Sequence, residues 1–295
     1  MDYRLYHDES KQGGYWHGML LVPENGRQEM YERLMEIRNA FNVSHTLGIK
    51  SVRSAAGPVA NTARSWLQLG TAALSSDFKG KPLSYQLQLD QTVTMTSPIG
   101  AKFIAFRKKG DHSDMTVPMS WASAVETTAR MGLKGGLHCL GSTMQPIRIV
   151  RMHFDGHEHY QRHLDKNRIV SRMVNLREYC SIDDASDLIV DGTSDHTREG
   201  CQDHIDCQFL QLTDLLIGSF RSVLGTGVRP EHQRLVHPVK SLVERYQKGA
   251  ARMSNSRWEN SFWLSQCELV DGRWLFSEME YQANARSAAI QTSLF

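Results

Sequence analysis

Residues 5–22 read LYHDESKQGGYWHGMLLV, and this stretch decides the fold class. The apolar run Tyr3–His7 predicts a strand, and Tyr15–Val22 predicts a second strand beside it, joined by a turn that contains two adjacent glycines. The first strand leads directly into Asp8 and Glu9. Two carboxylates at the end of a strand with a core-like pattern require an explanation.

The chain has 295 residues, of which 40% are hydrophobic and 22% charged, as in an ordinary globular protein. This length predicts one large core or an α/β domain with an accessory lobe. The formal net charge of +2 is too small to indicate a partner. No run of 18 apolar residues and no signal-peptide pattern occurs, so we expect no membrane span and a cytoplasmic protein.

Strands that alternate with helices predict an α/β fold with a mixed sheet. Periodic apolar residues predict helices at Arg27–Phe41, Ala60–Ala73, Ala122–Met131, Tyr160–Tyr179 and Gln208–Leu224. Further strands are expected at Tyr85–Leu89, Lys102–Arg107, Ile147–Phe154 and Leu188–Val190, with a C-terminal hairpin that turns at Asp271-Gly272. We expect one domain over 1–295, with an insertion or accessory lobe at 51–145 and an extension at 225–295.

The number of cysteines indicates whether the chain forms a disulfide framework. The five cysteines make an odd number in a large chain, which predicts reduced thiols rather than a disulfide framework. A zinc site is an alternative for His196, Cys201, His204 and Cys207, although their spacing matches no standard finger. A second candidate metal site is the group of His157, His159 and His163, of which the last two are four apart as on one helix face, although solvated histidines at a helix start are the simpler explanation.

Three predicted strands end in acids, namely Asp8, Asp155 and Asp191. In open α/β sheets, functional groups gather where strands end. Carboxylates that meet there repel one another, and Mg²⁺ or Mn²⁺ would remove that repulsion. Two such ions can activate a water for phosphodiester cleavage. A polar turn after the first strand is the alternative explanation of Asp8.

Asp214 lies within an apolar helix, where an unpaired charge would cost several kcal/mol. Helical spacing places Gln211, Asp214 and Gly218 on one face, and the glycine would let that face approach a sheet. An aspartate that bonds to nearby backbone is the alternative. In the first strand, Asp8 and Glu9 point to opposite faces. We therefore expect Asp8 to contact a metal and Glu9 to contribute as a further ligand or a supporting contact.

The YxDES start, the GMLLVP strand and the QLTDLLIGSF helix together resemble the family catalogued as "domain of unknown function 3800", over residues 1–50 and 147–224. The resemblance implies a ribonuclease H-like fold. It places Asp8, Glu9 and Ser10 in the first motif, and Gln211, Asp214 and Gly218 in the last. The family often has an E-L-K-like motif where this chain has HTLGIK, so that Gly48 replaces the glutamate and only Lys50 is kept.

Ribonuclease H-like folds take their acids from the first strand, a helix, the fourth strand and a late helix. The resemblance therefore implies a metal-dependent nuclease with catalytic Asp8, Asp155, Asp214 and Lys50. The ligands of Mg²⁺ or Mn²⁺ would come from Asp8, Glu9, Asp155, Asp191 and Asp214, with Ser10 and Gln211 in support. Family members occur in phage-defence or mobile-element loci, which implies a partner protein.

A basic helix after Asp155 would suit a phosphate backbone of DNA or RNA. Its candidate contacts are Arg162, Lys166, Arg168 and Arg172, although a solvated face is the simpler explanation. Because of Gly48, a non-catalytic nucleic-acid-binding or assembly subunit is the alternative function. A metal phosphohydrolase acting on a small substrate is a third hypothesis.

Overall fold

The structure is a computed structural model. It describes residues 1–74, 84–86, 92–94, 100–110, 121–141, 143, 146–155, 169, 171, 176, 178–182, 189–197, 204–226, 228–250 and 261–279. The strands are β1 (Asp2–Ser10), β2 (Tyr15–Pro23), β3 (Ser84–Gln86), β4 (Thr92–Thr94), β5 (Lys102–Lys108), β6 (Ile147–Asp155), β7 (Cys180–Ile182), β8 (Ile189–Gly192), β9 (Phe262–Val270) and β10 (Arg273–Glu278). The helices are α1 (Glu24–Ala40), α2 (Pro58–Leu74), α3 (Trp121–Leu140), α6 (Ile205–Arg221) and α7 (His237–Ala250), with short helical turns η1 (Ile49–Ser51), η3 (Ser222–Thr226) and η4 (Pro230–His232).

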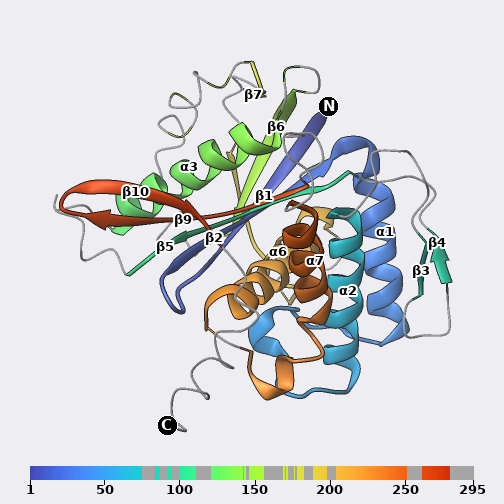
Figure 1. Ribbon diagram of the computed structural model, residues 1–295. Helices are drawn as coiled ribbons and strands as arrows, with labels where there is room; N and C mark the ends of the chain where they lie inside the picture. Colours follow the sequence, from blue (N-terminus) through green and yellow to red (C-terminus); the bar gives the residue numbers. More distant parts are fainter. Residues whose placement is uncertain are drawn as a thin grey trace, which may run out of the picture.

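A mixed sheet forms the centre of the molecule (Figure 1). Its strands follow in the order β10-β9-β5-β2-β1-β6-β7, and β8 also pairs with β6. β2 is antiparallel to both of its neighbours, β1 and β5, whereas β6 is parallel to β1, β7 and β8. The described residues therefore form the mixed α/β fold that the sequence predicts.

Helices cover both faces of this sheet. α6 packs against β1 and β2, and α1, α2 and α7 pack around α6, whereas α3 covers the opposite face (Figure 1). The buried apolar residues divide accordingly into two clusters, one with Tyr6 and Phe209 on the α6 face and one with Leu5 and Leu133 on the α3 face. Because side chains alternate along a strand, β1 presents different residues to each face.

Two glycines let α6 pack closely. A Cβ at Gly18 of β2 would lie 2.6 Å from Cβ of Ile217, so only glycine allows this approach of helix to sheet. Gly218 has the same role toward a different neighbour, since its Cβ would lie 2.7 Å from Cβ of Ile49. The expectation that Gly218 meets a sheet is therefore wrong, because it meets η1.

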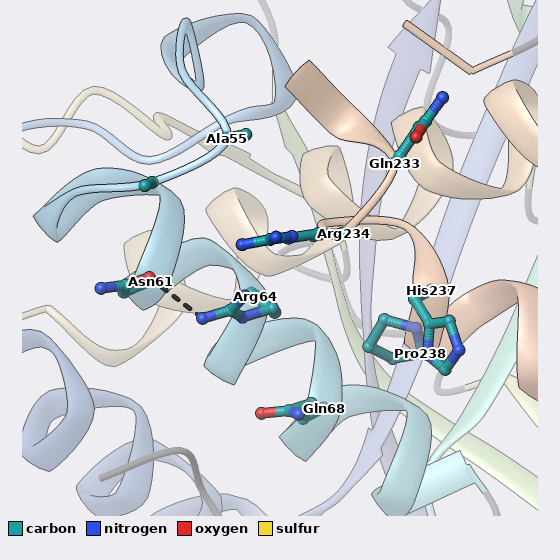
Figure 2. A pocket seen from close by; sticks show the side chains of 9 residues that line it. Ala55, Asn61, Arg64, Gln68, Gln233, Arg234, His237 and Pro238 are labelled. Atoms are coloured by element: carbon teal, nitrogen blue, oxygen red, sulfur yellow. Dashed lines mark hydrogen bonds between the residues drawn. The ribbon is translucent and has the colours of Figure 1, made fainter. Parts of the chain in front are cut away.

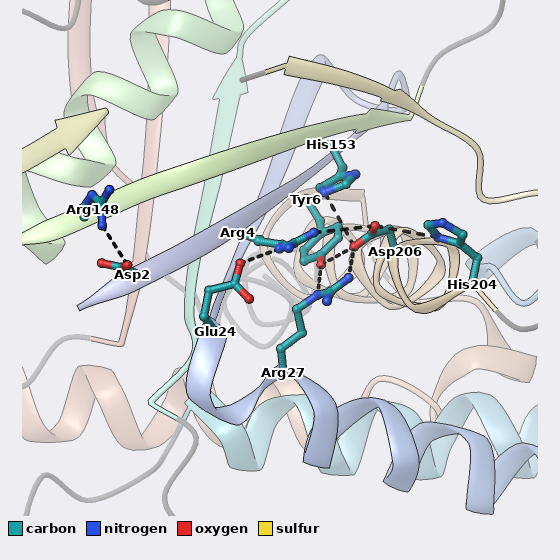
Figure 3. Close-up of polar contacts among 9 residues, drawn as sticks. All are labelled: Asp2, Arg4, Tyr6, Glu24, Arg27, Arg148, His153, His204 and Asp206. Atoms are coloured by element: carbon teal, nitrogen blue, oxygen red, sulfur yellow. Dashed lines mark hydrogen bonds and ion pairs between the residues drawn. The ribbon is translucent and has the colours of Figure 1, made fainter. Parts of the chain in front are cut away.

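A polar cluster holds the start of α6 against β1 and α1 (Figure 3). The carboxylate of Asp206 accepts hydrogen bonds from the Tyr6 hydroxyl (2.7 Å) and from Nη2 of Arg27 (2.5 Å). The ring of His153 stacks on Tyr6, with centroids 5.0 Å apart. Burial acts to raise the pKa of Asp206, but His153, the Tyr6 hydroxyl and Arg27 together bring it below its usual value. This cluster fixes the position of the helix that carries Asp214.

The C-terminal hairpin is confirmed, and it extends the central sheet. Asp271 (φ 50°) and Gly272 (φ 74°) form the turn between β9 and β10, as the sequence predicts. β9 pairs in parallel with β5. Residues 51–145 likewise contribute α2, β5 and α3 to the centre of the fold rather than forming the insertion or lobe that we expected.

Several helices and strands have other bounds in the structure than the sequence predicts. β1 continues to Ser10, so Asp8 and Glu9 lie within the strand rather than after it. α3 ends at Leu140, nine residues beyond the predicted Met131. The predicted helix at 160–179 lies largely outside the described residues.

The predicted thiol state is wrong for one cysteine. Cys139, Cys180 and Cys267 keep their thiols, but Cys207 is disulfide-bonded, and Cys201 lies outside the described residues. Within the part of the chain described here, no helix is both long and apolar enough to cross a bilayer.

Candidate active site

Three carboxylates lie near enough on the α6 face of the sheet to act on one another electrostatically. Asp8 follows Tyr6 by two residues on β1, and Asp155 is the last residue of the parallel neighbour β6. The register pairs His7 with Phe154, so the next residue of each strand, Asp8 and Asp155, lies at the same end of the sheet. α6 crosses β1 and adds Asp214. The first-strand, fourth-strand and late-helix acids of the sequence analysis are therefore neighbours.

The charges of these acids act on one another. Burial raises the pKa of Asp8 well above its usual range, and the carboxylates of Asp214 and Asp155 raise it further. Burial also raises the pKa of Asp214, to about 6, against the lowering effects of the Ile49 N–H and the Lys50 charge. All three acids keep partial solvent exposure. Burial and the mutual repulsion of these carboxylates disfavour three negative charges.

The segment that contains Gly48 holds the Asp214 carboxylate in place. Its Oδ2 accepts a hydrogen bond from the backbone N–H of Ile49 at 3.2 Å. A Cβ at Gly48 would collide with the same oxygen, closer than real Cβ atoms approach. The position where the resembled family has a glutamate therefore lies beside the acid group, and in this conformation only glycine fits there.

Gln211 supports this segment rather than contacting the acids. Its Oε1 accepts hydrogen bonds from the backbone N–H of Leu47 and from Nη2 of Arg38, both at 2.7 Å. Arg38 is buried, donates to the carbonyl of His45 at 2.8 Å and stacks over Trp66. Gln211 thus fixes the loop whose next residues surround Asp214.

Ser10 and Lys50 lie next to the acid group as well. The Ser10 hydroxyl accepts a hydrogen bond from Nη1 of Arg221. The Arg221 and Lys50 charges both lower the pKa of Asp214. Lys50 is exposed on η1, where it can contact a ligand in solution.

One predicted ligand, Glu9, is not brought to this group, and the position of a second, Asp191, is not tested. The Glu9 side chain points to the α3 face, where its Oε2 accepts a hydrogen bond from the Tyr15 hydroxyl, although its charge still raises the pKa of Asp8. Asp191 is the register partner of Phe154 on β8, and its side chain lies outside the described part. The acids that the structure joins are Asp8, Asp155 and Asp214.

Some residues near the site were missed by the sequence analysis. Arg221 follows Asp214 by seven residues, so helical spacing could have placed both on one face. Ser194 donates from Oγ to Oδ2 of Asp155 at 2.5 Å, and its backbone N–H lies 3.3 Å from Oδ1. Nothing in the local sequence around Ser194 signals this contact, because it depends on how β6 and β8 pair.

The predicted nucleic-acid contacts Arg162, Lys166, Arg168 and Arg172 lie outside the described residues. A different basic surface is described. Arg64 of α2 and Arg234 face a pocket of about 470 Å³ between α2 and the start of α7 (Figure 2). Burial and the Arg234 charge lower the pKa of Arg64. The remaining described lining is neutral or histidine: Ala55, Ala56, Asn61, Gln68, Gln233, His237 and Pro238. Such a pocket suits an anion.

Of the two other candidate metal sites, the structure tests one. Cys207 is disulfide-bonded and therefore supplies no thiolate, and Nδ1 of His196 lies 3.1 Å from the amide nitrogen of Gln208. His157, His159 and His163 lie outside the described residues.

The comparisons with known proteins found no relative. No family model matches the chain, and neither the curated proteins nor the solved structures contain a match. The resemblance to the "domain of unknown function 3800" family rests on the sequence motifs, and what it implies is carried forward as a proposal.

Proposed function

We propose that the protein is a metal-dependent nuclease with a ribonuclease H-like fold. One observation carries this proposal: Asp8, Asp155 and Asp214 come from two adjacent parallel strands and a late helix, and they act electrostatically on one another. β6 is the fourth strand of the central sheet in chain order, since β3 and β4 form a separate pair. The resembled fold takes three of its acids from the corresponding elements.

The donor set fits a hard divalent cation. All three side chains offer carboxylate oxygens, the ligands that Mg²⁺ and Mn²⁺ prefer. Burial and neighbouring carboxylates raise the pKa values of Asp8 and Asp214, and the charges of Lys50 and Arg221 offset this at Asp214 only in part. A bound ion would neutralise these acids and act as a Lewis acid toward water and phosphate.

The chain's own cations would hold the nucleic acid. Lys50 is exposed beside Asp214 and is placed to steady the phosphate that is cleaved. The pocket of Arg64 and Arg234 would receive a second phosphate of the same strand, because phosphate groups favour arginine. His232 connects this side of the molecule to the loop after η1, since its Nε2 lies 2.8 Å from the Val52 carbonyl oxygen.

Labelled single- and double-stranded DNA and RNA, incubated with Mn²⁺, Mg²⁺ or EDTA, test the proposal. The wild type should cleave at least one substrate in Mn²⁺ and none in EDTA. Asp8→Ala and Asp214→Ala should abolish cleavage while the folded circular-dichroism spectrum is kept. Asp2→Ala is the matched control, because Asp2 pairs with Arg148 on the surface of β1. Activity that survives in Asp214→Ala would refute the assignment.

A non-catalytic nucleic-acid-binding or assembly subunit is the second candidate. Gly48 favours it, because the helix position that often carries an acid in the resembled family offers none here. A subunit of this kind would bind nucleic acid with no thermal shift in Mn²⁺. A role in phage defence or a mobile element, with a partner protein from the same locus, belongs to either candidate and rests on the resemblance alone.

A further inference from the structure

A second group of ligand-type side chains lies on the opposite, α3 face of the β1–β2 hairpin. Glu9 and His17 are direct cross-strand partners in the antiparallel register, and His7 precedes Glu9 by two residues on the same face. One ligand atom from each of the three side chains lies within 4.8 Å of the others. Both histidines are fully buried, whereas Glu9 is partly exposed.

The protonation of His17 follows from its hydrogen bonds. Its Nε2 lies 2.8 Å from Oγ1 of Thr128, and that hydroxyl donates to a carbonyl of its own helix, Ala124 O at 3.0 Å. The Thr128 oxygen therefore accepts the Nε2–H of His17. Nδ1 of His17 is left with its lone pair, directed at Nε2 of His7 at 2.9 Å. Ligating histidines commonly donate their second ring N–H to such a supporting acceptor.

His7 is suited to the same purpose. Its ring is fully buried and stacks on that of His17, with ring centroids 5.2 Å apart. Its Nδ1 is buried without a hydrogen bond to any described residue. A hydrogen bond between the two histidines therefore accounts for only one of the two ring nitrogens of His7.

The third side chain has a supporting contact as well. The Tyr15 hydroxyl donates to Oε2 of Glu9 and orients the carboxylate. Partial exposure of Glu9 leaves a route by which an ion from solvent could enter.

We propose that His7, Glu9 and His17 bind a divalent transition-metal ion such as Zn²⁺, at a site separate from the three aspartates. Two imidazoles and one carboxylate match the ligand preferences of zinc, whereas the oxygen-only aspartate group favours Mg²⁺ or Mn²⁺. The ion would join β1 to β2, and Thr128 would connect it to α3. This inference does not depend on the proposed nuclease activity, because the two groups share no residue.

The proposed zinc site is tested by measuring Zn²⁺ binding to an Asp8→Asn/Asp214→Asn variant. These two substitutions weaken zinc binding by the aspartates, so that the remaining binding reports on the histidine site. Equilibrium dialysis followed by mass-spectrometric metal analysis should find one Zn²⁺ per chain. Adding Glu9→Gln or His17→Gln should weaken this binding about tenfold or more. Glu268→Gln, an exposed strand glutamate paired with Lys109, is the matched control and should leave the affinity unchanged.

Cobalt provides a spectroscopic readout. Co²⁺ bound in the same background should show visible absorption bands that His17→Gln removes and Glu268→Gln keeps. Glu9→Gln guards against misfolding of the buried histidine variant, since Glu9 is partly exposed. Equal Zn²⁺ affinity in the background, Glu9→Gln and His17→Gln proteins would overturn the proposal and leave a hydrogen-bonded histidine pair. That result would not touch the nuclease proposal, which fails only if metal-dependent cleavage is absent.

Discussion

Two aspartates eight residues apart on α6 have opposite environments. Asp206, at the start of the helix, has Arg27 and the Tyr6 hydroxyl as partners, and its pKa is lowered (Figure 3). Asp214, farther along the same helix, lies near the Asp155 carboxylate, and burial, aided by that charge, raises its pKa to about 6. The charge of Asp206 therefore stabilises the fold, whereas the charge of Asp214 opposes it. An acid whose charge the fold offsets only in part is a candidate for binding a ligand.

The largest expected effect is on cleavage. Asp214→Asn should lower metal-dependent cleavage by more than about 100-fold, because a ligand oxygen is lost. The melting temperature in EDTA should stay the same or rise, since the substitution removes a charge that burial disfavours. Calorimetry in EDTA, run beside the cleavage assay, checks both. A large fall in melting temperature would mean that Asp214 is structural.

Asp206→Asn should have the reverse signature. It should destabilise the protein by about 2–3 kcal/mol, because charge-assisted hydrogen bonds from Arg27 and Tyr6 are weakened in a mostly buried place. Urea unfolding at neutral pH measures the change. The folded fraction should keep its response to Mn²⁺. Loss of that response without loss of stability would show that the two ends of α6 do not differ as described.

The pH dependence of stability should reflect the Asp206 end of α6. His153 faces Tyr6, Asp206, Arg4, Arg27 and Arg151, and its pKa is lowered to about 4, chiefly by burial. The unfolded chain therefore takes up a proton on His153 as pH falls below about 6.5, whereas the folded protein does so only near pH 4. The free energy of unfolding should fall as pH drops from about 6.5 toward 4. The lowered pKa of Asp206 acts in the same direction below that range.

Urea unfolding at several pH values measures this slope. His153→Gln should make stability depend less on pH between about 6.5 and 4. A slope equal to that of the wild type would show that other groups cause the acid sensitivity.

The smallest effect is expected at the edge of the acid group. Gly48→Ala should lower cleavage about tenfold, because the new methyl group displaces the Asp214 carboxylate from its bond to the Ile49 N–H. Gly135→Ala on α3 is the control, since a Cβ there meets nothing within 4 Å. Steady-state kinetics of both variants give the comparison, and equal rates would mean that the Asp214 position is not critical.

Local patterns in the sequence were sufficient for β1, β2, β6 and α6, because alternation and helical periodicity identify such elements directly. They also placed Asp8 and Asp214 on the correct faces, since residue spacing determines the face. The site therefore followed from the sequence where each residue's position depends on its own element.

The pairing of strands that lie far apart in the chain could not be predicted from local sequence patterns. The parallel pairing of β9 with β5 brings residues 51–145 into the core, and no local pattern encodes it. The group of His7 and His17 depends on the β1–β2 register, which sets Glu9 opposite His17. Glu9 was assigned to the aspartate group because the resembled motif includes it, although alternation along the strand puts its side chain on the other face.

The most direct test of the central claim is Mn²⁺ binding by isothermal titration calorimetry, with wild-type protein and Asp155→Asn. Asp155 comes from β6, so its effect requires that β1, β6 and α6 form one site. The account predicts saturable Mn²⁺ binding by the wild type and an affinity at least about tenfold weaker in Asp155→Asn. Equal affinity in the two proteins, or no binding by the wild type, would contradict it.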